Sequence, residues 1–62
     1  MRYEYMIVYR GKKGVGRCFM CLDKVISSGH DVIATDEVIQ KEMCDDTMHV
    51  VDFKLLREIK EN

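Results

Sequence analysis

The chain has 62 residues and a formal net charge of −1, with 47% apolar and 34% charged residues. This length allows one domain, and the balance is that of a folded domain, not of a disordered chain. No apolar run approaches the roughly 18 residues of a membrane span, and the segment from Met1 to Arg10 lacks the pattern of a signal peptide. We therefore expect a cytoplasmic protein with no membrane partner, whose three cysteines are reduced.

Residues 3–10 predict the first strand, because they are rich in aromatic and β-branched side chains. Both faces of this strand are largely apolar, which suits a central position in a sheet. One face would hold Tyr3, Tyr5, Ile7 and Tyr9, and the other Glu4, Met6, Val8 and Arg10.

Three glycines within residues 11–16 predict a turn, since glycine readily adopts positive φ. Residues 17–22 then predict the second strand of a hairpin.

A helix is signalled by Ser28 and Asp31, which have the spacing of a capping box with Asp in place of Glu or Gln. Apolar residues follow at helical spacing and predict an amphipathic helix of about 12–14 residues. Its apolar stripe would hold Val32, Thr35, Val38, Ile39 and Met43; the opposite side would hold Asp36, Glu37, Gln40 and Lys41, and Ile33 lies off the stripe.

Residues 48–56 alternate well enough to predict a last strand, and residues 57–62 are polar and expected to fray. A right-handed crossover through the helix returns the last strand parallel to the second, on the far side of the first. The sequence thus predicts one small α+β domain over residues 1–62, a ββαβ arrangement with a three-stranded sheet of order 2-1-3 and one helix packed on one face.

The second face of such a sheet would be apolar and uncovered, which is unusual for a monomer. We therefore expect an interaction surface that a second copy covers in a two-fold homodimer, or that another protein covers. The sequence does not decide which face of the sheet meets the helix. The expected contact residues are Tyr5, Ile7, Tyr9 and Phe19.

Nucleic-acid binding through a basic hairpin tip is the alternative, because a two-stranded ribbon can enter a groove and aromatic rings can stack on bases. The tip would hold Arg10, Lys12, Lys13 and Arg17. Residues 1–31 contain six Lys/Arg and three Asp/Glu, whereas residues 32–62 contain four and eight. The acidic second half would repel a phosphate backbone lying along it.

Cys18 and Cys21 have a zinc-ligand spacing, and Cys44 with His49 could complete a set of four, with His30 in reserve. Residues three apart on a strand point to opposite faces, however, so packing cysteines are the favoured interpretation. We expect no metal and no cofactor.

An enzymatic role is disfavoured. His30 or His49 could pair with Asp31 or Asp52, but neither histidine has a well-placed serine or cysteine nucleophile beside it. A chain this small also offers little concave volume for a substrate. The sequence favours a non-enzymatic interaction module.

The chain resembles small uncharacterised proteins carried by phages and conjugative elements of Gram-positive bacteria. The resemblance covers nearly the whole chain and rests on structural motifs. They are Tyr3-x-Tyr5-Met6-Ile7-Val8-Tyr9, Gly14-Val15-Gly16-Arg17, Leu22-Asp23-Lys24-x-Ile26, Ser28-x-x-Asp31 and Val50-Val51-Asp52-Phe53-x-Leu55-Leu56. It implies a host-encounter or accessory role and no particular catalytic or binding residues.

Overall fold

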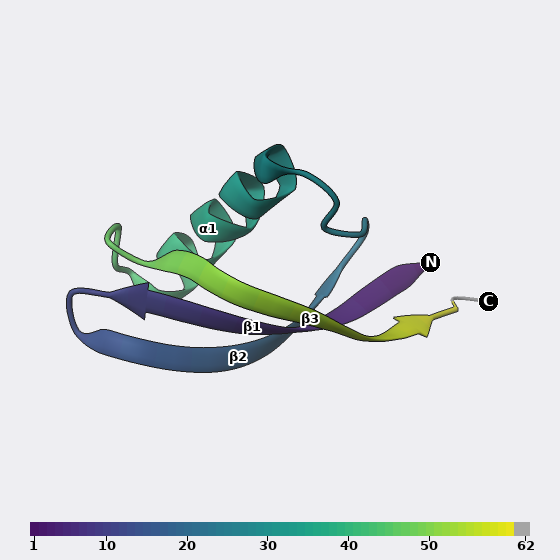
Figure 1. Cartoon of the computed structure of the whole chain (residues 1–62), viewed down its shortest axis with the longest axis horizontal. Helices are drawn as coiled ribbons and strands as arrows, with labels where there is room; N and C mark the ends of the chain where they lie inside the picture. Colours follow the sequence, from purple (N-terminus) through teal and green to yellow (C-terminus); the bar gives the residue numbers. More distant parts are fainter. Residues whose placement is uncertain (61–62) are drawn as a thin grey trace.

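The structure, a computed structural model, describes residues 1–60. Its elements in chain order are β1 (Arg2–Gly11), β2 (Gly14–Leu22), α1 (Gly29–Met43) and β3 (His49–Ile59). The strands form one sheet of order β2-β1-β3, with β1 antiparallel to both neighbours. α1 lies on one side of this sheet, and β1 begins at the end where β3 stops (Figure 1). The predicted α+β class and the 2-1-3 strand order are confirmed.

The hairpin turn is tighter than the sequence indicates. Gly11 pairs with Gly14, so only Lys12 and Lys13 lie outside the ladder, and both strands extend beyond their predicted ends. Gly14 has a φ of 121°, a conformation that side chains with a Cβ rarely adopt. Glycine at this position is what allows the chain to reverse within two residues.

The predicted cap starts the helix. Ser28 is the N-cap, and its hydroxyl oxygen accepts a hydrogen bond from the Asp31 amide at 3.4 Å. The Asp31 carboxylate in return accepts from the Ser27 amide at 3.0 Å. These reciprocal bonds satisfy amide donors that a helix start leaves free. The helix ends at Cys44, which donates its amide to the Gln40 and Lys41 carbonyls and has a left-handed φ of 52°, after which the Asp45 amide donates to the Gln40 carbonyl at 3.1 Å.

The core lies between α1 and one face of the sheet. Ile7 in the centre of β1 is 0% exposed and Ile39 of α1 is 1% exposed, and Tyr5 and Met48 complete the buried cluster. The Tyr5 hydroxyl oxygen accepts a hydrogen bond from the Ile26 amide at 2.9 Å, so the segment that leads to α1 is held against β1. Four buried apolar side chains make a small core for one domain.

Polar side chains fasten α1 to β3. The Asp36 carboxylate accepts a hydrogen bond from the Val50 amide at 2.6 Å, and the Gln40 side chain donates to the Met48 carbonyl at 3.0 Å. The sequence places both residues on the solvent side of the helix, and the structure corrects this. α1 lies beside β3, so the polar border of its apolar stripe meets backbone groups of the chain.

β3 is longer than predicted. Residues 57–59, expected to fray, pair with β1 through Arg57 with Glu4, Glu58 with Tyr3 and Ile59 with Arg2. Residues 61–62 of that predicted tail lie outside the described residues. Two register shifts interrupt the β1–β3 pairing, between Glu4 and Tyr5 and between Val8 and Tyr9. β-bulges of this kind bend and twist the strand that carries them.

Replacing Ile39 with Ala is expected to destabilise the fold strongly. Removing a buried Ile side chain costs about 2–5 kcal/mol, which is comparable to the roughly 3–5 kcal/mol that a core of this size contributes. Ile33 of the same helix is 57% exposed and provides the matched control, because Ile33→Ala removes the same atoms from a solvated position. Urea unfolding followed by circular dichroism measures both. Equal losses in the two variants would contradict the described core.

The Asp31 carboxylate is expected to support the fold at neutral pH and not in strong acid. Hydrogen bonds from the Ser27 amide and hydroxyl, followed by those from Ser28, hold the pKa of Asp31 below its usual range. A lowered pKa in the folded state adds stability above the unfolded-state pKa, and this is lost as the pH falls through the folded value. Asp31→Asn should therefore lower the urea midpoint at neutral pH and lose this effect in acid; a pH-independent difference would contradict the argument.

Candidate functional site

The structure divides the four predicted contact residues between the two faces of the sheet. Tyr5 and Ile7 are buried beneath α1, so they are core residues, and the expectation that they form an interaction surface is corrected. Tyr9 is half-buried on the same side, where its ring lies against Gly16. Phe19 pairs with Met6, so its side chain projects from the opposite face, and it is 61% exposed.

The face of the sheet away from α1 is here called the open face. Paired residues on neighbouring strands project from the same face of a sheet. The open face therefore consists of the even-numbered residues of β1 and their partners on β2 and β3. Its apolar centre consists of Met6, Val8 and Phe19, with Val15 and Cys21 at the margin. Its charged residues are Arg2, Glu4, Arg10, Arg17, Asp52, Lys54 and Arg57, and His49 also projects from it.

Cations predominate on the open face. One of its arginines, Arg57, is engaged with Glu4, with 2.9 Å between Nε and the carboxylate oxygen. In the paired rows from Glu4 to Arg10, three further cations are present, which are Arg10, Arg17 and Lys54. The one further acid in these rows is Asp52. The centre of the face is thus apolar and its surroundings carry a net positive charge.

The acidic residues of the second half lie mainly elsewhere. α1 contains Asp31, Asp36, Glu37 and Glu42 against one lysine, Lys41. The helix is on the other side of the sheet from the open face (Figure 1). The fold therefore separates charge between two sides, and the helix acids do not oppose an anion lying on the open face.

The hairpin tip is divided in the same way. Arg10 and Arg17 belong to the open face, whereas Lys12 and Lys13 lie at the turn, close enough to Asp45 to help lower its pKa. The larger cause of that lowered pKa is hydrogen bonding from Thr47, whose hydroxyl also accepts the Lys12 amide at 3.1 Å. The tip is thus held against the 45–47 loop through the Lys12 amide.

The cysteines are not assembled as zinc ligands. Cys18 pairs with Ile7 on the helix side of the sheet, Cys21 pairs with Glu4 on the open face, and Cys44 lies at the end of α1. Within residues 1–60 no group of three or more His, Cys, Asp or Glu side chains is arranged to hold a metal ion. The weak alternative of a site made by Cys18, Cys21, Cys44 and His49 is corrected, because a regular strand turns its two cysteines apart.

Within residues 1–60, neither histidine forms a hydrogen bond or an ion pair with the aspartate expected to be its catalytic partner. His30 and His49 are both exposed, and His49 Nδ1 lies 3.2 Å from the Thr47 carbonyl oxygen. Asp31, the expected partner of His30, is bonded to Ser27 and Ser28 instead, and Asp52 accepts from the Phe53 amide.

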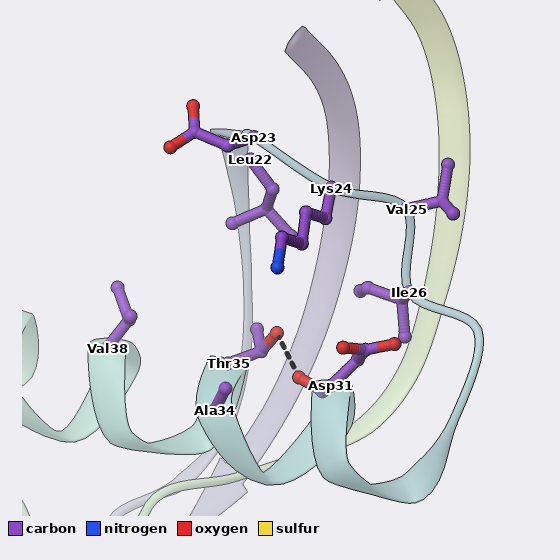
Figure 2. A pocket seen from close by; sticks show the side chains of 9 residues that line it. All are labelled: Leu22, Asp23, Lys24, Val25, Ile26, Asp31, Ala34, Thr35 and Val38. Atoms are coloured by element: carbon purple, nitrogen blue, oxygen red, sulfur yellow. Dashed lines mark hydrogen bonds between the residues drawn. The ribbon is translucent and has the colours of Figure 1, made fainter.

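The concave regions are shallow. Figure 2 shows one of about 270 Å³ between the segment before α1 and the first half of the helix, with Lys24 extending over it. Within it the Thr35 hydroxyl donates to the Asp31 carbonyl oxygen at 2.9 Å, so both groups are occupied within the helix. A groove of about 360 Å³ follows β2 beside α1. Neither resembles the deep pocket with converging polar groups that holds a small substrate.

Lys54 and Met6 are members of the open face that sequence reasoning does not identify as site residues. Met6 could be found from the alternation of β1, once the buried face is known. Lys54 depends on the register of β3, and the two bulges shift that register by a residue each, so strict alternation fails there.

Comparison of the chain with protein-family models, with curated proteins and with solved structures finds no match. Within residues 1–60, no helix has the length and hydrophobicity needed to cross a bilayer.

Cys44 is expected to react with iodoacetamide faster than Cys18. The thiolate is the reactive form, and burial raises the pKa of the Cys18 thiol, whereas Cys44 is exposed at the helix end. Brief alkylation at mildly alkaline pH followed by peptide mass mapping gives the order of modification. Unfolding in urea is the control and should remove the difference; faster labelling of Cys18 in the folded protein would contradict the burial described.

Proposed function

We propose that this chain is a small, non-enzymatic interaction module that binds single-stranded nucleic acid across the open face of its sheet. The observation that carries the proposal is the exposed ring of Phe19 on the same face as Arg17 and Lys54. Proteins that bind single strands combine aromatic rings, on which bases stack, with cations that follow the phosphate backbone. Such binding tolerates many sequences, because every base offers a flat face.

The rows of the sheet support this arrangement. Phe19, Met6 and Lys54 lie in one row across the three strands, and Arg17, Val8 and Asp52 lie in the next row, so this part of the face holds two cations and one acid. Neighbouring strands are about 4.8 Å apart, so Lys54, two strands away, lies roughly 10 Å from Phe19, and Arg17 lies two residues from Phe19 on the same strand. A base on the Phe19 ring would have its phosphates within reach of both cations, and Met6 and Val8 would form the apolar floor beside it.

A single strand suits this face better than a duplex. The bases of a duplex are stacked on one another, so an exposed ring on a sheet finds no free base face, whereas an unpaired strand can present its bases outward. The acids of α1, which would repel a phosphate backbone, are on the other side of the sheet.

A protein partner on the same face is less well supported, although the sequence alone favours it. Met6 and Val8 are half-buried, so the apolar centre is narrow. Two copies packed face to face would bring together the cations Arg10, Arg17 and Lys54 of each copy, at a cost in free energy. A nucleic-acid-binding module also fits the accessory role that the resemblance to proteins of mobile elements implies.

Fluorescence anisotropy with labelled oligo-dT tests the proposal. Binding is expected to weaken between about 50 and 200 mM salt, as counterion release requires. Phe19→Ala should weaken binding about 5- to 150-fold, since stacking contributes about 1–3 kcal/mol per base. Arg17→Glu should weaken binding and reduce the slope of log affinity against log salt by about one.

Lys41→Glu provides the matched control, because it makes the same change from positive to negative charge on the exposed helix side. It should leave the affinity nearly unchanged. Equal losses in Arg17→Glu and Lys41→Glu would show a nonspecific charge effect and contradict the open face as the site. Tighter binding of a duplex of the same length, or no salt-dependent binding at all, would overturn the proposal; in the second case a protein partner becomes the favoured class.

A further inference from the structure

The two free edges of the sheet differ in how well they are protected against pairing. An edge strand exposes backbone N–H and C=O groups that can pair with another strand, and proteins block this with bulges and charged side chains. β3 has both protections. It contains two register shifts, and charged residues recur along it at Asp52, Lys54, Arg57 and Glu58.

β2 has neither protection. Its nine residues pair with β1 without a register shift, and Arg17 is the one charged residue among them. A regular edge strand with a single charge is a suitable template for another strand. Two of its side chains, Val15 and Phe19, are also well exposed, at 68% and 61%.

The groove of about 360 Å³ beside β2 adds apolar surface next to this edge. Met20 and Leu22 line it from the strand, and Val38 and Met43 line it from α1, where they are 43% and 40% exposed. α1 lies over the β3 side of the sheet, so it leaves this strip uncovered. An additional strand paired with this edge would satisfy its backbone groups. The side chains of that strand on the α1 side of the sheet would cover the groove.

We propose that β2 pairs antiparallel with β2 of a second copy of this chain, about a two-fold axis at Cys18, the midpoint of the strand. The strand is complementary to itself in this register. On the open face Arg17 is opposite Phe19 of the partner, and Val15 is opposite Cys21. Arg17 of one copy is thus opposite an aromatic ring and not directly opposite the second Arg17.

The helix side fits equally well. Leu22 meets Gly14 of the partner, where nothing lies within 4 Å of the position that a Cβ would take, and Met20 meets Gly16. Tyr9 lies over Gly16, where an added Cβ would be 2.5 Å from its hydroxyl oxygen, so Met20 would contact the partner's tyrosine ring. The pair forms a continuous six-stranded sheet with both helices on one side. A domain with four buried apolar residues gains the additional burial that small domains need.

Short bis-maleimide cross-linking in the absence of nucleic acid tests the register. A variant with Cys18 as its one cysteine (Cys21→Ala, Cys44→Ala) should form covalent dimers, because residues directly opposite have Cβ atoms about 4.5–5.5 Å apart. The matched control keeps Cys44 alone (Cys18→Ala, Cys21→Ala). Cys44 is the more exposed thiol, so efficient cross-linking at Cys18 and not at Cys44 reflects position and not reactivity. The reverse result would overturn the proposal.

Sedimentation equilibrium over a concentration series tests the pairing itself. The wild-type chain should associate to dimers and no further, and Met20→Lys should raise the dissociation constant at least tenfold. If Met20→Lys does not fold, Val38→Lys, at an exposed position of α1 that lines the groove, should raise the dissociation constant in the same way. The control is Val51→Lys on the β3 edge, which should leave the dissociation constant unchanged. A chain that stays monomeric at all concentrations would refute the proposal. Binding of an extended peptide to the β2 edge of such a monomer would not rescue it. Nucleic acid is absent, so this failure is separate from failure of the binding function.

Discussion

The alternation of side chains along β1 is the constraint on which the rest of the structure depends. β1 is the central strand, so each of its residues must suit either the core under α1 or the open face. Tyr5 and Ile7 pack into the core, whereas Met6 and Val8 form the middle of the other face. A shift of one residue would exchange the two sets and expose the tyrosines. Both the core and the candidate binding surface are thus set by the same eight or so residues.

The position of α1 over one side of the sheet follows from polar as well as apolar contacts. Ile39 supplies the apolar contact, and Asp36 and Gln40 bind the backbone at the start of β3. Because the helix packs on the side of the sheet opposite the open face, its carboxylates stay away from that face. Because it is also held close to β3, the strip beside β2 stays uncovered.

Much of the fold could be predicted from the sequence because its signals are local. The glycine turn, the Ser28 cap and the alternation of β1 each depend on a few neighbouring residues, and they sufficed for the strand order. The candidate site could not be predicted in this way. Which face of β1 meets the helix depends on long-range packing, and the place of Lys54 depends on two bulges that leave no clear mark in the sequence. The sequence does predict Phe19 as a contact residue, but together with Tyr5, Ile7 and Tyr9, which lie on the opposite face.

The bulges of β3 have a consequence for the size of any assembly. A sheet with two open edges can add copies at both ends without limit, which is the geometry of a fibre. Here one edge is twisted and charged, so growth can proceed from the other edge alone, and a two-fold pair consumes that edge in both copies. In the proposed dimer the association is then closed at two, and the nine-residue edge strand β2 is kept out of further contacts by the partner strand.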